Sequence, residues 1–402
     1  MTETKPAKPA AEVWITGIGL ATSLGEGLDA TWDALNQRRV NVDEKKFAPY
    51  VVHPWAPVNF DTQIPKKGDQ RQMEAWQRIG TYTAGLALDS AGIKGNQEIL
   101  ARTDMIVAAG GGERDLKVDS TILSGLPRAQ NPAAFLNERL MSDLRPTLFL
   151  AQLSNLLAGN ISIVHGVTGS SRTFMGEESA GVDAVRIALS RINANQSDIA
   201  LVGGAHNGER EDLLMLYEFA GQTLKDRFAP VWERSGNPGF ALGSLGAFLV
   251  IEASEHAQAR GAKPLAKLTA VVSDRSNRQP GAVTAALEGL WDKIKDKIKP
   301  GHAAVLSGAT GAEPGTSEER AFLSSHGDLA VRATGSYFGH GLEPQFSMNV
   351  ALATVALGHG SLFPPCDSTG LEKPMSGDLS QVLVTGVGHW RGEGLALVER
   401  VG

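Results

Sequence analysis

The chain has 402 residues, 42% of them hydrophobic, and a formal net charge of −6 at pH 7. It is long enough to bury a core as one large domain or as two of ordinary size. The negative charge excludes the basic surface expected of a nucleic-acid-binding protein, and no apolar run reaches the ~18 residues that cross a bilayer. Its single cysteine, Cys366, excludes internal disulfides and thiolate metal clusters, so we expect a cytoplasmic protein.

The predicted elements begin after a polar, Pro- and Lys-rich stretch, residues 1–11, which we expect to be a disordered tail. Short apolar runs predict buried strands at 13–18, 105–109, 199–205, 247–252, 265–272, 303–308 and 382–387. Because they do not alternate with polar residues, these runs are typical of sheets buried on both faces. Helical spacing predicts helices at 73–88 and 181–192 and a fully buried helix at 346–357. Strands that alternate with helices favour an α/β protein.

The segment 255–264 divides the chain into two halves. A polar helix ends there at Gly261, Pro264 follows, and a new strand begins. We therefore expect an N-terminal half at 12–258 and a C-terminal half at 263–402. The pentapeptides "ITGIG" and "VTGVG" are similar strand ends in the two halves and give weak support for a duplication.

Three kinds of sequence pattern that often indicate a cofactor or metal site are incomplete in this chain. Gly17 and Gly19 follow the first predicted strand, but the third glycine of a dinucleotide-binding fingerprint would fall on Thr22, so close packing is the better interpretation. "AAGGGERD" lacks the Lys-Ser/Thr pair of a phosphate-binding loop. The histidines show no zinc-binding spacing. We expect neither a cofactor nor a metal.

"RTFMGEESAGVDA", residues 172–184, predicts a tight strand-to-helix turn with two adjacent carboxylates, Glu177 and Glu178, at its apex. Such turns often hold a nucleophile. Longer stretches in the same order resemble the β-ketoacyl-acyl-carrier-protein synthases, condensing enzymes of the thiolase superfamily, at 13–39, 159–185, 229–268 and 333–365. The resemblance implies a thiolase-like α-β-α-β-α layered fold of two similar halves, with a dimer formed through the first half.

The resemblance also assigns the site residues, and most of the family's catalytic groups are missing. The family's acyl-accepting cysteine falls on Glu178, and its first catalytic histidine falls on Gly308. The second catalytic histidine is retained as His340. Gly335 replaces a lysine, and Ser244 replaces a glutamate.

Two aromatic residues complete the site that the resemblance implies. Trp390 is the expected counterpart of the family's gating aromatic, and Phe240 is expected at the gate or acyl tunnel. Glu178 itself has two interpretations. It caps its helix and fills the oxyanion hole, since a helix N-terminus favours a carboxylate by about 0.3–1 kcal/mol, or it acts as a general base together with His340.

Decarboxylative condensation needs a thiol to hold one acyl group and two imidazoles to stabilise the enolate. We therefore expect a chain that is condensation-incompetent alone and resembles the chain-length-factor partners of polyketide synthases. Its partners would be an acyl carrier protein and either a second copy or an active synthase. The alternative is a malonyl-acyl-carrier-protein decarboxylase or acyl hydrolase that uses Glu178 and His340. A third possibility is a homodimeric acyl-binding or carrier-binding module without turnover.

Overall fold

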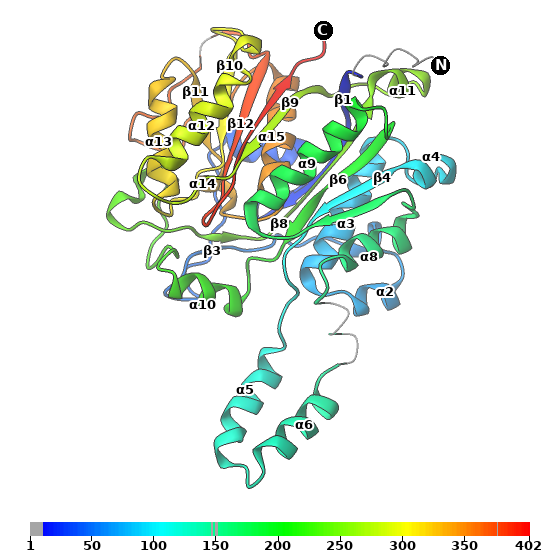
Figure 1. Cartoon of the computed structure of the whole chain (residues 1–402), viewed down its shortest axis with the longest axis vertical. Coiled ribbons are helices and arrows are strands. Elements are labelled where there is room, and N and C mark those ends of the chain that lie inside the picture. Colours follow the sequence, from blue (N-terminus) through cyan, green and yellow to red (C-terminus); the bar gives the residue numbers. More distant parts are fainter. Residues whose placement is uncertain (1–10, 146–147, 149–151, 376) are drawn as a thin grey trace, which may run out of the picture.

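A computed structural model describes residues 11–145, 148, 152–375 and 377–402. The expected tail falls almost entirely on residues outside this range. Helices cover a strongly twisted sheet on both faces, and one helical hairpin extends away from the body (Figure 1). This is the α/β class expected from the sequence, and the described residues contain no helix that is both long and apolar enough to span a membrane.

The strands repeat one order in the two halves of the chain. The first half has the order β5-β4-β6-β8-β1, and the second has the order β11-β10-β12-β13-β9. In each half, the first three strands of that order pair in parallel and the last two join antiparallel. The strands are β1 (Val13–Thr22), β4 (Asp104–Ala108), β5 (Ser171–Phe174), β6 (Ile199–His206), β8 (Leu245–Ala253), β9 (Ala266–Asp274), β10 (Ala303–Ser307), β11 (Ala330–Ala333), β12 (Gln381–Val387) and β13 (Glu393–Glu399).

A short antiparallel contact between β1 and β9 joins the two halves into one continuous sheet. The repeated strand order gives the two similar halves that were expected. The exact boundaries at 258 and 263 remain predictions, although helix α11 (Ser254–Ala259) and β9 lie on either side of that segment.

Two long helices form the middle layer between the halves. Helix α9 (Glu177–Asn193) belongs to the first half and packs on β9, whereas α15 (Gln345–His359) belongs to the second half and packs on β8. Every residue of α15 from Gln345 to Leu357 is buried, which confirms the predicted fully buried helix. Helices α3 (Ala75–Ser90) and α8 (Leu156–His165) cover the first half, and α12 (Ala282–Asp292) and α13 (Gly315–Ser325) cover the second (Figure 1). The layers are therefore α-β-α-β-α.

The glycines of β1 pack against α3, as the sequence suggested. A Cβ atom on Gly17 would lie 2.6 Å from the Ala87 carbonyl oxygen, and one on Gly19 would lie 1.9 Å from the Thr83 carbonyl oxygen. No side chain fits at that separation, so these two glycines allow the strand to approach the helix closely. The dinucleotide interpretation is not needed to explain them.

The remaining elements are shorter. They are β2 (Gly25–Glu26), α1 (Leu28–Asn36), β3 (Val52–His53), α2 (Lys67–Gln72), α4 (Gln97–Arg102), α5 (Leu116–Gly125), α6 (Pro132–Asp143), α10 (Glu211–Phe219), β7 (Leu242–Gly243) and α14 (Gly335–Phe338), with 3₁₀ turns at Phe60–Thr62, Leu126–Arg128, Val231–Gly236 and Lys295–Lys297.

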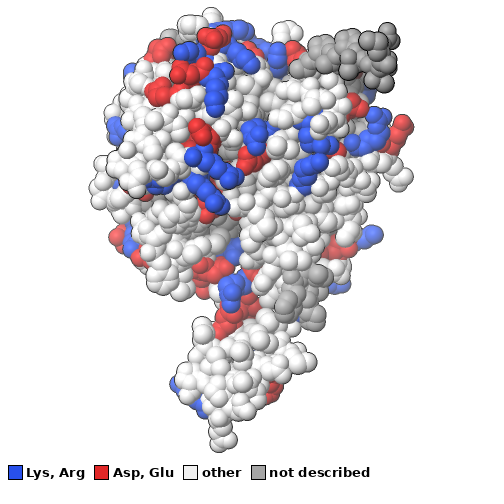
Figure 2. Space-filling view, in the orientation of Figure 1, with Lys and Arg blue, Asp and Glu red and all other residues white. Residues whose placement is uncertain are grey.

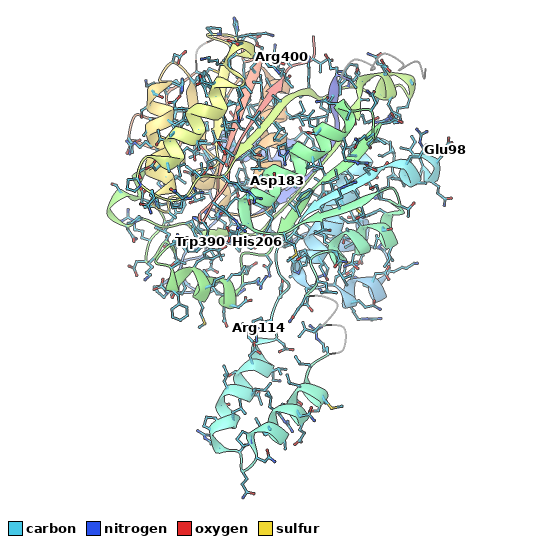
Figure 3. All side chains as sticks on the ribbon, viewed as in Figure 1. Glu98, Arg114, Asp183, His206, Trp390 and Arg400 are labelled. Carbon is cyan, nitrogen blue, oxygen red and sulfur yellow. The ribbon has the colours of Figure 1, made fainter. Side chains whose placement is uncertain are left out.

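Helices α5 and α6 form the extension that projects from the body, with Arg114 at its base (Figure 3). In the space-filling view, the surface of this extension carries few charged side chains (Figure 2). Leu123 on α5 is 71% exposed and Met141 on α6 is 79% exposed. Together with α10, whose Phe219 is 85% exposed, the extension borders an open groove of about 1010 Å³. We call Leu123, Met141 and Phe219 the apolar rim.

Candidate functional site

The predicted strand-to-helix turn is present where β5 ends at Phe174 and α9 begins at Glu177. Gly176 takes φ +106° and Glu177 takes φ +49°, a left-handed conformation that is uncommon outside glycine. This sharp bend separates the directions of the two carboxylates. Glu177 lines a cavity, whereas Glu178 turns into the core and is buried.

Glu178 lies between two histidines that come from distant parts of the chain. His340 Nε2 lies 2.6 Å from Glu178 Oε1 and forms a hydrogen bond with it. His389 Nε2 lies 3.5 Å from the same oxygen, and the backbone N–H of His389 donates to Glu178 Oε2 at 3.4 Å. His340 follows α14, and His389 lies in the turn between β12 and β13. The residues that the resemblance assigns to the second catalytic histidine and to the nucleophile position are therefore in direct contact.

Phe240 packs against both imidazoles. Its ring stacks on His389 at a centroid distance of 4.5 Å and meets His340 edge-on at 5.1 Å. Tyr217 on α10 in turn contacts Phe240 edge-on at 4.9 Å. The structure thus brings Phe240, Glu178 and His340 together.

Trp390, the expected gating aromatic, lies on the surface beside this cluster. Trp390 is 47% exposed and lies at the tip of the β12–β13 turn (Figure 3). Its neighbour His389 is buried and occupies the position beside Glu178. His389, and not Trp390, is therefore the residue of this turn that contacts Glu178, and the gating role of Trp390 stays a prediction.

The charges in this cluster follow from burial and contact. Burial alone would raise the pKa of Glu178, but His389 and the hydrogen bond from His340 outweigh it and hold the pKa at about 2. Burial lowers the pKa of His389 to about 4, against the attraction of Glu178. At neutral pH Glu178 is therefore an anion, and since a carboxylate only accepts hydrogen bonds, His340 Nε2 is the donor.

Backbone atoms crowd Gly308 and Gly335, the two positions at which the resemblance implies a lost histidine and a lost lysine. A Cβ atom on Gly308 would lie 2.6 Å from the Thr385 carbonyl oxygen, and one on Gly335 would lie 2.8 Å from the Ala309 carbonyl oxygen. The Gly308 N–H donates to the Thr385 hydroxyl at 2.9 Å. Ser244, where the resemblance implies a glutamate, is buried and accepts a hydrogen bond from the Gly208 N–H at 2.9 Å.

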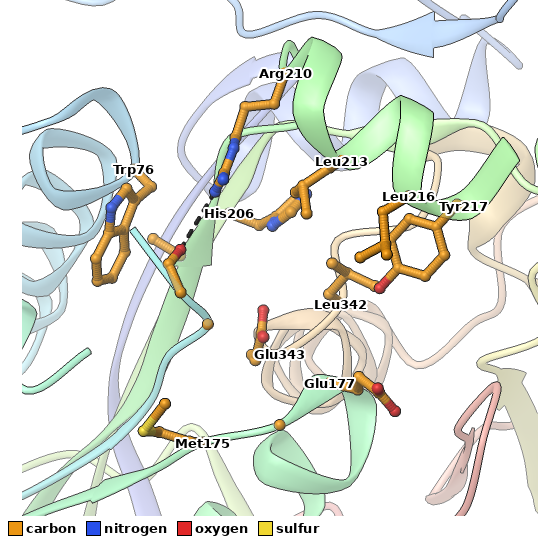
Figure 4. Close-up of a pocket in the computed structure, with 14 residues that line it drawn as sticks. Trp76, Met175, Glu177, His206, Arg210, Leu213, Leu216, Tyr217, Leu342 and Glu343 are labelled. Carbon is orange, nitrogen blue, oxygen red and sulfur yellow. Dashed lines mark hydrogen bonds between the residues drawn. The ribbon is translucent and has the colours of Figure 1, made fainter. Parts of the chain in front are cut away.

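A cavity of about 240 Å³ adjoins the elbow (Figure 4). Its polar lining includes Glu177, Glu343, His206, Arg210 and Tyr217, but neither Glu178 nor His340. Burial raises the pKa of Glu343 to about 8 and lowers the pKa of His206 well below its ordinary value. Arg210 Nη1 donates to the Gly111 carbonyl oxygen at 3.3 Å.

Sequence reasoning missed three of the residues at this site. His389, His206 and Glu343 lie in a turn, at the end of β6 and just before α15. Their side chains converge only through the fold, and no motif in the sequence links them.

The donor atoms of Glu178, His340 and His389 all lie within 4.8 Å of one another. Within the described part of the chain, this is the group of three His, Cys, Asp or Glu side chains close enough to hold a metal ion. The chain positions 178, 340 and 389 are too widely separated to form any sequence motif for a metal site.

Comparisons with known proteins agree with this architecture. The family model described as "Beta-ketoacyl synthase, N-terminal domain" matches residues 10–257. A 3-oxoacyl-[acyl-carrier-protein] synthase 2 of Vibrio harveyi is 26% identical over 273 residues, which cover 64% of this chain and 61% of that protein. A mitochondrial 3-oxoacyl-[acyl-carrier-protein] synthase of Arabidopsis thaliana is 22% identical over 393 residues, 87% of this chain and 82% of that protein.

Two solved structures share the fold. "The ishigamide ketosynthase/chain length factor" has a TM-score of 0.80 at 18% identity and covers 98% of this chain and 100% of that one. A second, described as a type II PKS acyl-carrier protein in complex with its ketosynthase, has a TM-score of 0.74 at 16% identity, with 98% and 100% coverage. The match to the Vibrio relative spans about three-fifths of its length. By its family model and its fold, the chain belongs to the β-ketoacyl synthase family.

Proposed function

We propose that this chain is a condensation-incompetent synthase homologue that serves as the partner subunit of an active β-ketoacyl synthase. It would act in fatty-acid or polyketide assembly on an acyl carrier protein and shape part of the acyl tunnel. The observation that carries the proposal is the buried Glu178–His340 hydrogen bond at the position of the family's acyl-accepting cysteine.

The chemistry of condensation opposes a catalytic role for this site. An acyl group on a carboxylate is an anhydride, which is far more labile than the thioester that a cysteine forms. Glu178 is also held in place by two histidines. The second imidazole that the enolate requires cannot be accommodated at Gly308 with the present backbone, because the Thr385 carbonyl oxygen already fills that space.

A partner role is supported by the surface of the first half. The apolar rim on the extension and α10 exposes large hydrophobic side chains beside an open groove. Exposed apolar patches of this kind mark interaction sites on soluble proteins. One solved structure with the same fold is described as a ketosynthase/chain length factor, and the partner role is proposed for this chain by analogy with it.

Co-expression with each cysteine-containing synthase of the same genome tests the proposal. Native mass spectrometry should detect a heterodimer, and condensation of acyl-carrier-protein substrates should appear with the heterodimer and not with this chain alone. A Glu178→Ala heterodimer should keep turnover, with changed stability or product length. Elongation of an acyl-carrier-protein substrate by the purified chain alone would contradict the proposal.

The second candidate is a malonyl-acyl-carrier-protein decarboxylase or acyl hydrolase. The 2.6 Å contact between Glu178 and His340 favours it, because a carboxylate–imidazole pair can act as a general base. The negative charge of Glu178 opposes it, since that charge repels both a malonyl carboxylate and an enolate oxygen. This candidate predicts turnover by the chain alone that both Glu178→Ala and His340→Ala abolish.

A further inference from the structure

The Glu178, His340 and His389 side chains form a compact set of donors at the junction of the two halves. Glu178 is the second residue of α9 in the first half, while His340 and His389 come from separate loops of the second half. All three side chains are buried. His389 Nε2 has no hydrogen-bond partner in the described part of the chain, although it lies 3.5 Å from Glu178 Oε1.

Two imidazoles and one carboxylate are a donor set that Zn²⁺ binds readily. Zinc bonds to these atoms are about 2.0–2.2 Å long, so neighbouring donors around a tetrahedral ion lie roughly 3.3 Å apart. The His389–Glu178 separation of 3.5 Å already fits this spacing. The His340–Glu178 separation of 2.6 Å is too short and has to widen by less than about 1 Å.

We propose that Glu178 Oε1, His340 Nε2 and His389 Nε2 bind one divalent transition-metal ion, with Zn²⁺ the best match to the donor set. The site occupies the place of the family's nucleophile, and its ligands come from both halves of the molecule. Binding would therefore tie α9 to the two loops of the second half. The partner role does not depend on this ion, so the two proposals stand or fall separately.

Ion binding requires a change of proton position on His340. The metal needs the lone pair of Nε2, which now donates its proton to Glu178. Nδ1 of the same ring is buried and has no hydrogen-bond partner among the described residues. The proton leaves Nε2, and the ring adopts the tautomer that carries its proton on Nδ1. The hydrogen bond to Glu178 is exchanged for two metal–ligand bonds.

The residues around the three donor side chains determine how tightly the site should bind an ion. Phe240 contacts both imidazole rings and holds their orientation. Ligating histidines usually donate their second N–H to a carboxylate or carbonyl, and loss of such a partner weakens metal binding by ~10–100-fold. Because His340 Nδ1 lacks this partner, we expect weaker binding than at a fully supported structural zinc site.

The test uses the untagged full-length chain, stripped with a chelator and then dialysed free of it. Titration with Co²⁺ should produce the visible absorption of a four- or five-coordinate ion at one equivalent per chain, and Zn²⁺ should bleach it. Saturating Zn²⁺ should also raise the melting temperature, because the ion binds the folded state.

Two ligand variants and one control make the test decisive. Glu178→Gln and His389→Gln should each weaken Co²⁺ binding at least tenfold, whereas His302→Gln, at an exposed histidine, should not change it. Circular dichroism melts of the metal-free variants establish that they fold. If one of the two ligand variants does not fold, the other alone is sufficient for the binding test. Absence of a Co²⁺ spectrum in the wild type, or equal binding by the ligand variants, would overturn the inference.

Discussion

At neutral pH a full negative charge sits on Glu178 between the two halves of the molecule, because its pKa is held at about 2. Its neighbours are imidazoles, one in a hydrogen bond at 2.6 Å and one at 3.5 Å. A buried charge that loses its partner is much more costly than a buried pair removed as a whole. The three side chains should therefore respond to substitution as a unit.

We expect His340→Ala to lower the free energy of unfolding by about 3–5 kcal/mol, because it leaves the Glu178 anion buried without its hydrogen bond. Glu178→Ala should lower the free energy of unfolding by less. The double variant, Glu178→Ala with His340→Ala, should lose less free energy of unfolding than the two single variants lose together. Urea denaturation in the presence of a chelator measures all four proteins of the cycle. Additive losses would show that the two side chains do not interact.

The buried carboxyl of Glu343 should make the free energy of unfolding depend on pH. Burial raises its pKa from 4.5 to about 8, so the unfolded chain ionises this carboxyl at a lower pH than the folded chain does. The contribution of Glu343 to stability is fully present below pH 4.5 and is lost as the pH rises towards 8. The total loss is about 5 kcal/mol at most.

The measurement is the difference in unfolding free energy between pH 5 and pH 8 for the wild type and Glu343→Gln. We expect the variant to gain stability over the wild type as the pH rises, because glutamine cannot ionise. Asp274→Asn, at an exposed carboxylate at the end of β9, serves as the control and should leave the wild-type pH dependence unchanged. Parallel pH profiles for Glu343→Gln and the wild type would contradict the assignment of Glu343 as a neutral acid.

Part of the site could be predicted from the sequence, because two of its residues each lie in a continuous segment with a recognisable pattern. Glu178 sits in a continuous strand-turn-helix segment, and His340 follows a recognisable Gly-rich run, so both could be placed by counting residues. His389 could not, because one residue more or less in the β12–β13 turn exchanges it with Trp390. Glu343 and His206 meet at the cavity only through tertiary packing, which leaves no periodic signal.

At the scale of elements, the backbone leaves little room for a side chain at Gly308, directly after β10, where the resemblance implies a catalytic histidine. Gly308→Ala should destabilise the protein by about 1–3 kcal/mol, because the new Cβ atom would meet the Thr385 carbonyl oxygen at 2.6 Å. Gly289→Ala on α12 is the matched control. Its Cβ atom would meet nothing within 4 Å, so we expect about 0.5–1 kcal/mol of added stability.

The same lack of room limits any attempt to restore activity. Glu178→Cys combined with Gly308→His should fold poorly and should not condense acyl substrates, because the imidazole has no room. Thermal melts and a condensation assay on the double variant check both statements. A stable, active double variant would mean that the backbone around Gly308 yields easily, and that only side chains separate this protein from its active relatives.

Each predicted apolar run coincides with a strand, and 346–357 is the buried α15. Strand β5 was expected only as the strand side of the turn at 172–184, because its residues "SRTF" are half exposed at the edge of the sheet and form no apolar run. Strands β11 and β13 were not predicted, although both are almost fully buried. Helices α5 and α6 were not predicted either, and they bury few residues because they project from the body (Figure 1).

At the scale of the whole molecule, the repeated strand order makes the two halves structural equivalents, yet only the first carries an extension. The extension, which carries Leu123 and Met141 of the apolar rim, projects away from the second half (Figure 1). An apolar surface that the chain's own core does not cover is costly unless another surface buries it. We infer that association with a partner subunit buries the rim.

Charged substitutions in the rim should therefore separate association from folding. Leu123→Glu combined with Met141→Glu should weaken heterodimer formation at least tenfold, since burying unpaired carboxylates in an apolar interface is strongly unfavourable. Monomer stability should hardly change, because both side chains are already exposed. Gln258→Glu combined with Ala321→Glu adds the same charges at exposed positions on α11 and α13, at the other end of the molecule, and should leave association intact. Native mass spectrometry and co-purification with the active synthase measure both pairs. Wild-type association by the rim variant would place the partner on another face and leave the apolar extension without a role in assembly.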